Sequence, residues 1–130
     1  MTIAIVIVAI VAVDFVLAIA AFRFVVARAW RPFESRFPPT PTTPDAVVRT
    51  AQTFIIDRLP FARAFDVAVD EACLHLTPRR LWRLVGARPI SVPWEAVVPD
   101  PGPESPRWRT VTIDGVPMAG PRWCLDLAAR

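Results

Sequence analysis

The first 27 residues carry a nearly unbroken run of apolar side chains, whereas the remainder alternates short apolar segments with prolines and charges. Between Ile3 and Phe22 there are thirteen large apolar residues, six alanines and a single charged residue, Asp14. A helix of this length matches the hydrocarbon core of a bilayer, which is about 30 Å thick. The large side chains favour insertion by about 4 to 8 kcal/mol, against a cost of about 3 kcal/mol for a central aspartate. The pattern therefore predicts a transmembrane anchor at residues 1–27.

The charges beside this segment predict its orientation. Arg23, Arg28 and Arg31 follow the apolar run, and no basic side chain precedes it. The positive-inside rule then places the N-terminus outside and the remainder in the cytoplasm. All fifteen basic residues are arginines, which is typical of a GC-rich bacterial coding bias, so we expect the bacterial inner membrane. Trp30 and Phe33 alternate with the arginines, and we predict that these five residues lie at the membrane interface.

A cleaved signal peptide is the alternative interpretation, because Ala18-Ile19-Ala20 resembles a cleavage site. Against it, the N-terminus has no basic region and the apolar run continues through Phe24-Val25-Val26. A released domain would be periplasmic or secreted, and only there could Cys73 and Cys124 form a disulfide.

Asp14 is the one ionisable residue of the predicted span. Such residues usually face a partner helix, a water-filled cavity or a proton path. A single span offers no second titratable group for a proton path. Two interpretations therefore remain open: Asp14 contacts a partner helix, or the bilayer tolerates it in its protonated form.

Beyond the span, the pattern predicts a Pro/Thr-rich linker and a β-rich domain. Residues 38–44 read PPTPTTP, a spacer biased to polyproline II with a reach of roughly 20 Å. We therefore assign residues 28–44 to a juxtamembrane belt and linker, and residues 45–130 to the domain. Alternating apolar residues predict strands at Phe65–Val69, Cys73–Thr77, Pro89–Val92, Arg109–Ile113 and Trp123–Leu127. Residues 45–58 fit a helix or a strand.

The predicted fold is therefore a single N-terminal transmembrane α-helix followed by a small, mainly-β domain. Fifteen prolines lie mostly between the predicted strands and exclude long helices from that domain. Several short strands with turn signals between them indicate a sandwich or a partly open barrel.

Three segments resemble a group of uncharacterised bacterial membrane-anchored proteins with a pleckstrin-homology-like (GRAM-like) domain. They are the aromatic entry from Trp30 to Pro38, the hairpin from Val67 to Leu76, and the run RPISVPWEAV at residues 88–97. The resemblance implies a β domain that binds a lipid headgroup, a peptide or a protein without catalysis. It also implies a strand at residues 47–56 and a structural plug formed by Trp94. An amphipathic helix closes the barrel in such proteins, and the sequence departs from them here, so we expect a C-terminal helix that is short or absent.

A basic cluster in a predicted loop between two strands is the candidate lipid-facing site. It consists of Arg79, Arg80, Trp82 and Arg83. The arginines would contact lipid phosphates while the indole lies at headgroup level. The alternative is that Leu81, Trp82 and Leu84 pack in the core and the arginines are solvated.

The sequence offers no catalytic constellation. His75 is the only histidine, and neither it nor the two cysteines match a metal-ligand or redox spacing. Cys73 and His75 stand two residues apart on a predicted strand, where side chains rarely meet within hydrogen-bond reach. We therefore predict no enzyme, no metal and no cofactor. A net charge of +3, scattered along the chain, also argues against nucleic acid as a partner.

These observations support three hypotheses for function. The first is a non-catalytic module, tethered to the membrane, that recruits or stabilises a protein partner or a second copy of itself, with Asp14 specifying the partner helix. The second is a lipid-headgroup-binding module that uses the Arg79–Arg83 loop. The third is a periplasmic or secreted domain released from a signal peptide.

Overall fold

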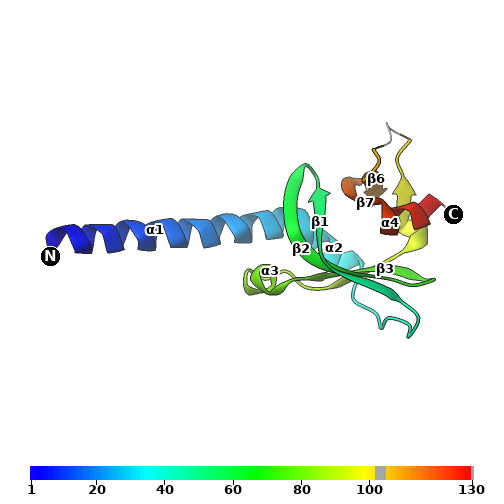
Figure 1. The fold of residues 1–130 in the computed structure, drawn as a ribbon, viewed down its shortest axis with the longest axis horizontal. Helices are drawn as coiled ribbons and strands as arrows, with labels where there is room; N and C mark the ends of the chain where they lie inside the picture. The colour runs from blue at the N-terminus through cyan, green and yellow to red at the C-terminus, as the bar shows by residue number, and fades with distance from the viewer. Residues whose placement is uncertain (102–104, 130) are drawn as a thin grey trace.

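A long helix leads into a β domain in the computed structural model, which describes residues 1–101 and 105–129 (Figure 1). Helix α1 (Thr2–Val25) continues through a π-helical turn, η1 (Val26–Trp30), into α2 (Arg31–Arg36). None of the side chains of α1 is buried by the rest of the protein, and this stretch is long and apolar enough to span a membrane. The predicted apolar helix is confirmed.

The β domain is a seven-stranded antiparallel sheet that is nearly closed into a barrel. Its strands are β1 (Val47–Ile56), β2 (Leu59–Val69), β3 (Cys73–Pro78), β4 (Ile90–Pro93), β5 (Val97–Pro99), β6 (Trp108–Ile113) and β7 (Val116–Pro121). The strand order is β4-β3-β2-β1-β7-β6-β5. The short helices are α3 (Arg80–Leu84), η2 (Trp94–Ala96), α4 (Arg122–Leu125) and η3 (Asp126–Ala129). The mainly-β fold class with a short C-terminal helix is therefore confirmed.

The connection between the two edge strands explains why the sheet curls. Strands β4 and β5 are at opposite edges of the sheet, yet only the three residues of η2 separate them in the chain. A connection of this length spans at most about 13 Å. The two edges of the sheet must therefore approach each other. Two residues with positive φ, Ala51 at 55° and Arg63 at 50°, accompany register shifts between β1 and β2. Such bulges increase twist and bend the strands, which helps the sheet to close.

The helical entry supplies part of the core of the β domain. Val26, Ala29, Trp30 and Phe33 are buried, and this spacing places them on one helical face. The indole of Trp30 is stacked on Phe65 with ring centroids 4.7 Å apart, and its Nε1 donates to the carbonyl of Arg88 at 2.8 Å. The prediction that Trp30 and Phe33 lie at a membrane interface is therefore wrong. Both rings are buried in the barrel, because the curled sheet encloses an apolar interior that needs large side chains.

Most of the predicted strands are present. The hairpin of Phe65–Val69 with Cys73–Thr77 corresponds to β2 and β3, and residues 47–56 of the ambiguous segment 45–58 form β1. The strand predicted at Trp123–Leu127 is wrong, because this segment is helical in α4 and η3. Pro121 ends the last strand, and an i,i+4 ion pair between Arg122 and Asp126 supports the helical turn instead.

A contact at Gly120 gives a test of this packing. An added Cβ there would lie 2.5 Å from the ring of Phe54, which is fully buried. We expect Gly120→Ala to lower the free energy of unfolding by about 1–3 kcal/mol through overpacking. Urea unfolding in detergent, followed by tryptophan fluorescence, measures the change. Gly115→Asn is the matched control, because nothing lies within 4 Å of that Cβ and asparagine tolerates the positive φ of 78°. Equal stability of the two variants would contradict this account of the core.

Candidate functional site

Helix α3 lies where the long helix enters the β domain (Figure 1). The segment predicted as a loop is a short helix whose two faces differ. Trp82 is buried, and its ring packs against the rings of Phe22 on α1 and Phe61 on β2. The ring centroids are 5.2 Å and 4.8 Å apart, respectively. Leu81 and Leu84, by contrast, are 61% and 71% exposed. Trp82 therefore joins the long helix to the barrel, and the two leucines, not the indole, face outward.

The arginines of this region divide into paired and unpaired groups. Arg79 is bound to the carboxylate of Asp66 on β2 at 3.0 Å. Within the described part of the chain, Arg23, Arg80 and Arg83 form no ion pair or side-chain hydrogen bond, and the same holds for Arg28 and Arg31 further along the helix. The predicted cluster is thus reduced, because Arg79 is neutralised by its neighbour.

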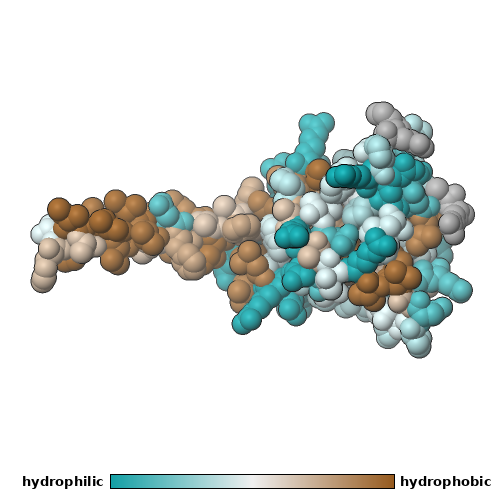
Figure 2. All heavy atoms as spheres, viewed as in Figure 1, coloured by the Kyte–Doolittle hydropathy of each residue, from teal (hydrophilic) through white to brown (hydrophobic). Residues whose placement is uncertain are grey.

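We call the outward-facing residues at this junction the helix-exit face. It consists of Arg23, Arg80, Leu81, Arg83 and Leu84, and Figure 2 shows apolar side chains over α3 with hydrophilic ones beside them. Burying each leucine is worth about 1.5–3 kcal/mol, and each arginine contributes about 1 kcal/mol beside an anionic lipid surface. This face therefore has the chemistry of a contact with an anionic, partly apolar surface.

A second polar cluster is buried at the edge of the sheet, and the sequence did not indicate it. His75 on β3 contacts Asp70 through Nε2 at 2.8 Å and Ser91 on β4 through Nδ1 at 2.7 Å. His75 and Ser91 are only 5% and 4% exposed. Asp70 also accepts hydrogen bonds from the backbone N–H groups of Ala72 and Cys73 in the β2–β3 turn. The cluster therefore links the turn to the edge strand.

The predicted Pro/Thr-rich linker is bound to this cluster. The carbonyl of Phe37 accepts a hydrogen bond from the backbone N–H of Ser91, and the N–H of Thr40 donates to Ser91 Oγ at 2.9 Å. The N–H of Thr43 donates to Asp70 Oδ2 at 3.4 Å. We call residues 37–43 the strap, because they run from β4 to the β2–β3 turn and are held there by these three hydrogen bonds. The Pro/Thr-rich segment is thus part of the domain surface.

An acid, an imidazole and a hydroxyl in a row are also the components of a nucleophilic site. Here, however, Ser91 Oγ is enclosed beneath the strap and already accepts a hydrogen bond from Thr40. A nucleophile needs access to substrate, which this position lacks. The geometry fits a structural role, in which this hydrogen-bonded cluster holds the strap against the sheet.

The two cysteines are free thiols with no features of a reactive site. Burial raises the pKa of Cys73, and it raises the pKa of Cys124 to about 12. A thiol with a raised pKa carries little of the reactive thiolate at neutral pH. Among the described residues, no group of three or more His, Cys, Asp or Glu side chains is placed to hold a metal ion.

The remaining predicted positions lie apart from these clusters. Trp94 is half-buried at the rim of the sheet, where its Nε1 donates to the carbonyl of Asp70 at 2.8 Å. It closes the β2–β3 turn and packs against the core, whereas the indole of Trp30 is fully buried. Asp14 is exposed on α1, eight residues before Phe22 and therefore about 12 Å along the helix from it.

Comparison with known proteins finds no match: no family model, no curated protein and no solved structure corresponds to this chain. The resemblance to pleckstrin-homology-like proteins is therefore supported only at the level of architecture, an apolar N-terminal helix followed by a small, nearly closed β domain.

The buried carboxylate of Asp70 makes stability depend on pH. Burial alone raises the pKa of Asp70, but the hydrogen bonds from His75, Cys73, Ala72 and Thr43 outweigh it and lower the pKa to about 2. The stabilisation is therefore complete above the unfolded-state pKa, near 3.8, and is lost as the pH falls towards 2. We expect a loss of about 2 kcal/mol over this range, measured by urea unfolding at successive pH values.

Two variants test the assignment to Asp70. Asp70→Asn should be less stable than the natural chain at pH 6 and should lack this part of the acid dependence. Glu71→Gln, an exposed neighbour in the same turn, should keep the acid dependence unchanged. An Asp70→Asn variant with the full acid dependence would show that another group is responsible.

Proposed function

We propose that this protein is a single-span membrane protein whose β domain faces the cytoplasm and acts as a non-catalytic interaction module. The observation that carries the proposal is the continuity of the apolar helix with the core of the domain. None of the side chains of α1 is fully buried, while the turn that follows it inserts Trp30 between the strands. A domain built in this way is held at the membrane surface in one orientation, which suits the recruitment of a partner at a set distance from the bilayer.

The distribution of charge supports the cytoplasmic orientation. Arg23, Arg28 and Arg31 follow the apolar segment without ion-pair partners in the described part of the chain. Unpaired arginines within the first turns after a span favour retention on the cytoplasmic side. The bacterial inner membrane is the proposed location, in keeping with the arginine-rich composition.

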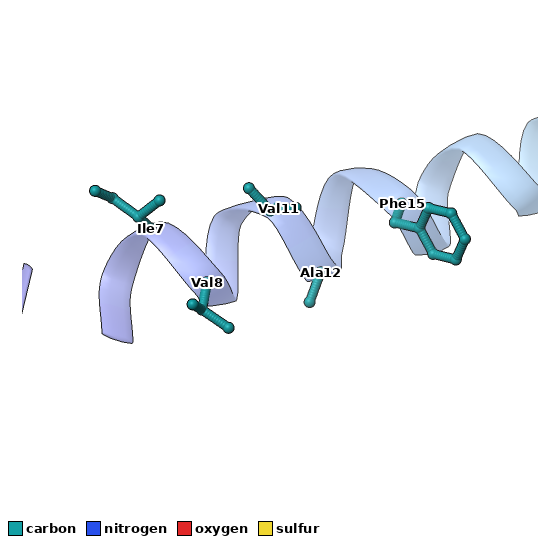
Figure 3. A pocket seen from close by; sticks show the side chains of 5 residues that line it. All are labelled: Ile7, Val8, Val11, Ala12 and Phe15. Atoms are coloured by element: carbon teal, nitrogen blue, oxygen red, sulfur yellow. The ribbon is translucent and has the colours of Figure 1, made fainter. Parts of the chain in front are cut away.

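The uncovered helix supports a protein partner within the membrane. Figure 3 shows Ile7, Val8, Val11, Ala12 and Phe15, the apolar side chains that line a shallow groove on α1. Asp14 lies in the same two turns. A carboxyl group at this depth is stabilised by a hydrogen-bonding group on a second helix, from another protein or from a second copy of the chain.

Topology is the first test of the proposal. Green fluorescent protein or alkaline phosphatase, fused after Arg130 in a bacterial host, reports the side on which the domain lies. We expect fluorescence in the membrane fraction and no phosphatase activity, because the arginines follow the span. Phosphatase activity with a shortened, soluble chain would instead establish a signal peptide and a released domain.

The role of Asp14 is tested by removing its hydrogen-bonding capacity. We expect Asp14→Leu to abolish assembly into a complex, measured as the loss of the larger species on native gels of detergent-solubilised membranes. Asp14→Asn is the matched control, since the amide still forms a hydrogen bond across helices. A complex of unchanged size in Asp14→Leu would show that the bilayer merely tolerates this carboxyl group.

A further inference from the structure

We propose that α3 is an interfacial anchor: Leu81 and Leu84 insert into the leaflet from which α1 emerges, and Arg80, Arg83 and Arg23 bind the phosphates of anionic lipids there. This inference rests on the proposed membrane span and adds a second contact with the same bilayer. It assigns a lipid surface, and not a protein, to the helix-exit face.

The first argument is the level at which α3 meets the long helix. The ring of Trp82 packs edge-on against Phe22 with centroids 5.2 Å apart. From Thr2 to Phe22 the helix rises about 30 Å, which equals the thickness of the hydrocarbon core. Helix α3 is therefore placed where the acyl chains end and the headgroups begin, and Arg23 follows Phe22 directly.

The second argument is that α3 is held at this level. Four aromatic rings pack in series: Trp82 on Phe61, Phe61 on Phe65, and Phe65 on Trp30. The distances between their ring centroids are 4.8 Å, 5.8 Å and 4.7 Å, in that order. Trp30 itself belongs to the helical stretch that continues from α1. The rings thus form a closed path from the helix through the barrel to α3 and back to the helix. A swing of the domain away from the bilayer would break this path.

The third argument is the chemistry of the outward side of α3. Leu81 and Leu84 are spaced i,i+3, so they share one face of the helix, while Trp82 is directed into the protein. Arg80 and Arg83 stand beside them, and no carboxylate in the described chain pairs with either. Asp66, on the neighbouring strand β2, is paired with Arg79 instead. Leucines flanked by unpaired arginines are the composition of short helices that lie in the plane of an anionic interface.

The depth of α3 is measured in the full-length protein. An environment-sensitive fluorophore is attached at Leu84→Cys or Leu81→Cys in a Cys73→Ser background, where the remaining thiol, Cys124, is buried. The control position is Val98→Cys on β5, which is 56% exposed and so comparable with Leu81. The chain is reconstituted in vesicles of phosphatidylcholine and phosphatidylglycerol at three to one, containing lipids with a nitroxide near the headgroup.

We expect the fluorophores on α3 to emit at shorter wavelength and to be quenched by the nitroxide, while the fluorophore at Val98 stays in water. Quenching on α3 no greater than at Val98 would overturn the inference, because α3 would then face water or a protein. Flotation of the chain with the vesicles is scored in the same samples. If flotation persists while quenching is absent, the membrane span stands and only the role of α3 fails.

The arginines are tested by comparing quenching from anionic and zwitterionic spin-labelled lipids. We expect the double variant Arg80→Gln, Arg83→Gln to lower the preference for the anionic lipid by roughly 30-fold, since two surface charges are removed. Arg107→Gln, an exposed arginine that precedes β6, should leave the preference unchanged. An unchanged preference in the double variant would overturn the assignment of these arginines to lipid phosphates.

Discussion

The insertion of Trp30 into the barrel is the interaction on which the rest of the structure depends. Its ring is stacked on Phe65, and its N–H is satisfied by the carbonyl of Arg88, so a large polar-edged side chain is buried without an unpaired donor. Because Trp30 belongs to the same helical stretch as α1, the direction of the long helix and the core of the β domain are determined together. The core therefore begins at Val26, well before the first strand at Val47.

The closure of the sheet follows from local features that support this core. The three-residue connection between the edge strands brings β4 and β5 towards each other, and the bulges at Ala51 and Arg63 add curvature. Side chains satisfy the backbone at both bulges: Asp66 accepts from the N–H of Ala51, and Thr53 accepts from the N–H of Arg63. Asp66 also binds Arg79, so one carboxylate both stabilises the curvature and neutralises an arginine next to α3.

The sequence predicted the elements more reliably than their packing. Period-two alternation located β2, β3, β4 and β6, because that signal is local. The same signal failed at Trp123–Leu127, where Pro121 and an ion pair favour a helix. The arginines around Trp30 and Phe33 predict an interfacial position, although the spacing of these two residues with Val26 and Ala29 also fits a buried face. The contacts among Asp70, His75 and Ser91 had no local signal, since 16 residues separate His75 from Ser91 and strand pairing alone brings them together.

The strap has a consequence for behaviour at high local concentration. An edge strand exposes unpaired N–H and C=O groups that can pair with a neighbouring molecule. On β4 the N–H of Ser91 is occupied by the carbonyl of Phe37, and three of the seven strap residues are prolines, which have no N–H to donate to a further strand. Proteins confined to a membrane collide in two dimensions and in similar orientations, which favours edge-to-edge association. By occupying this edge of β4, the strap reduces the backbone groups through which one copy of the domain could pair with another.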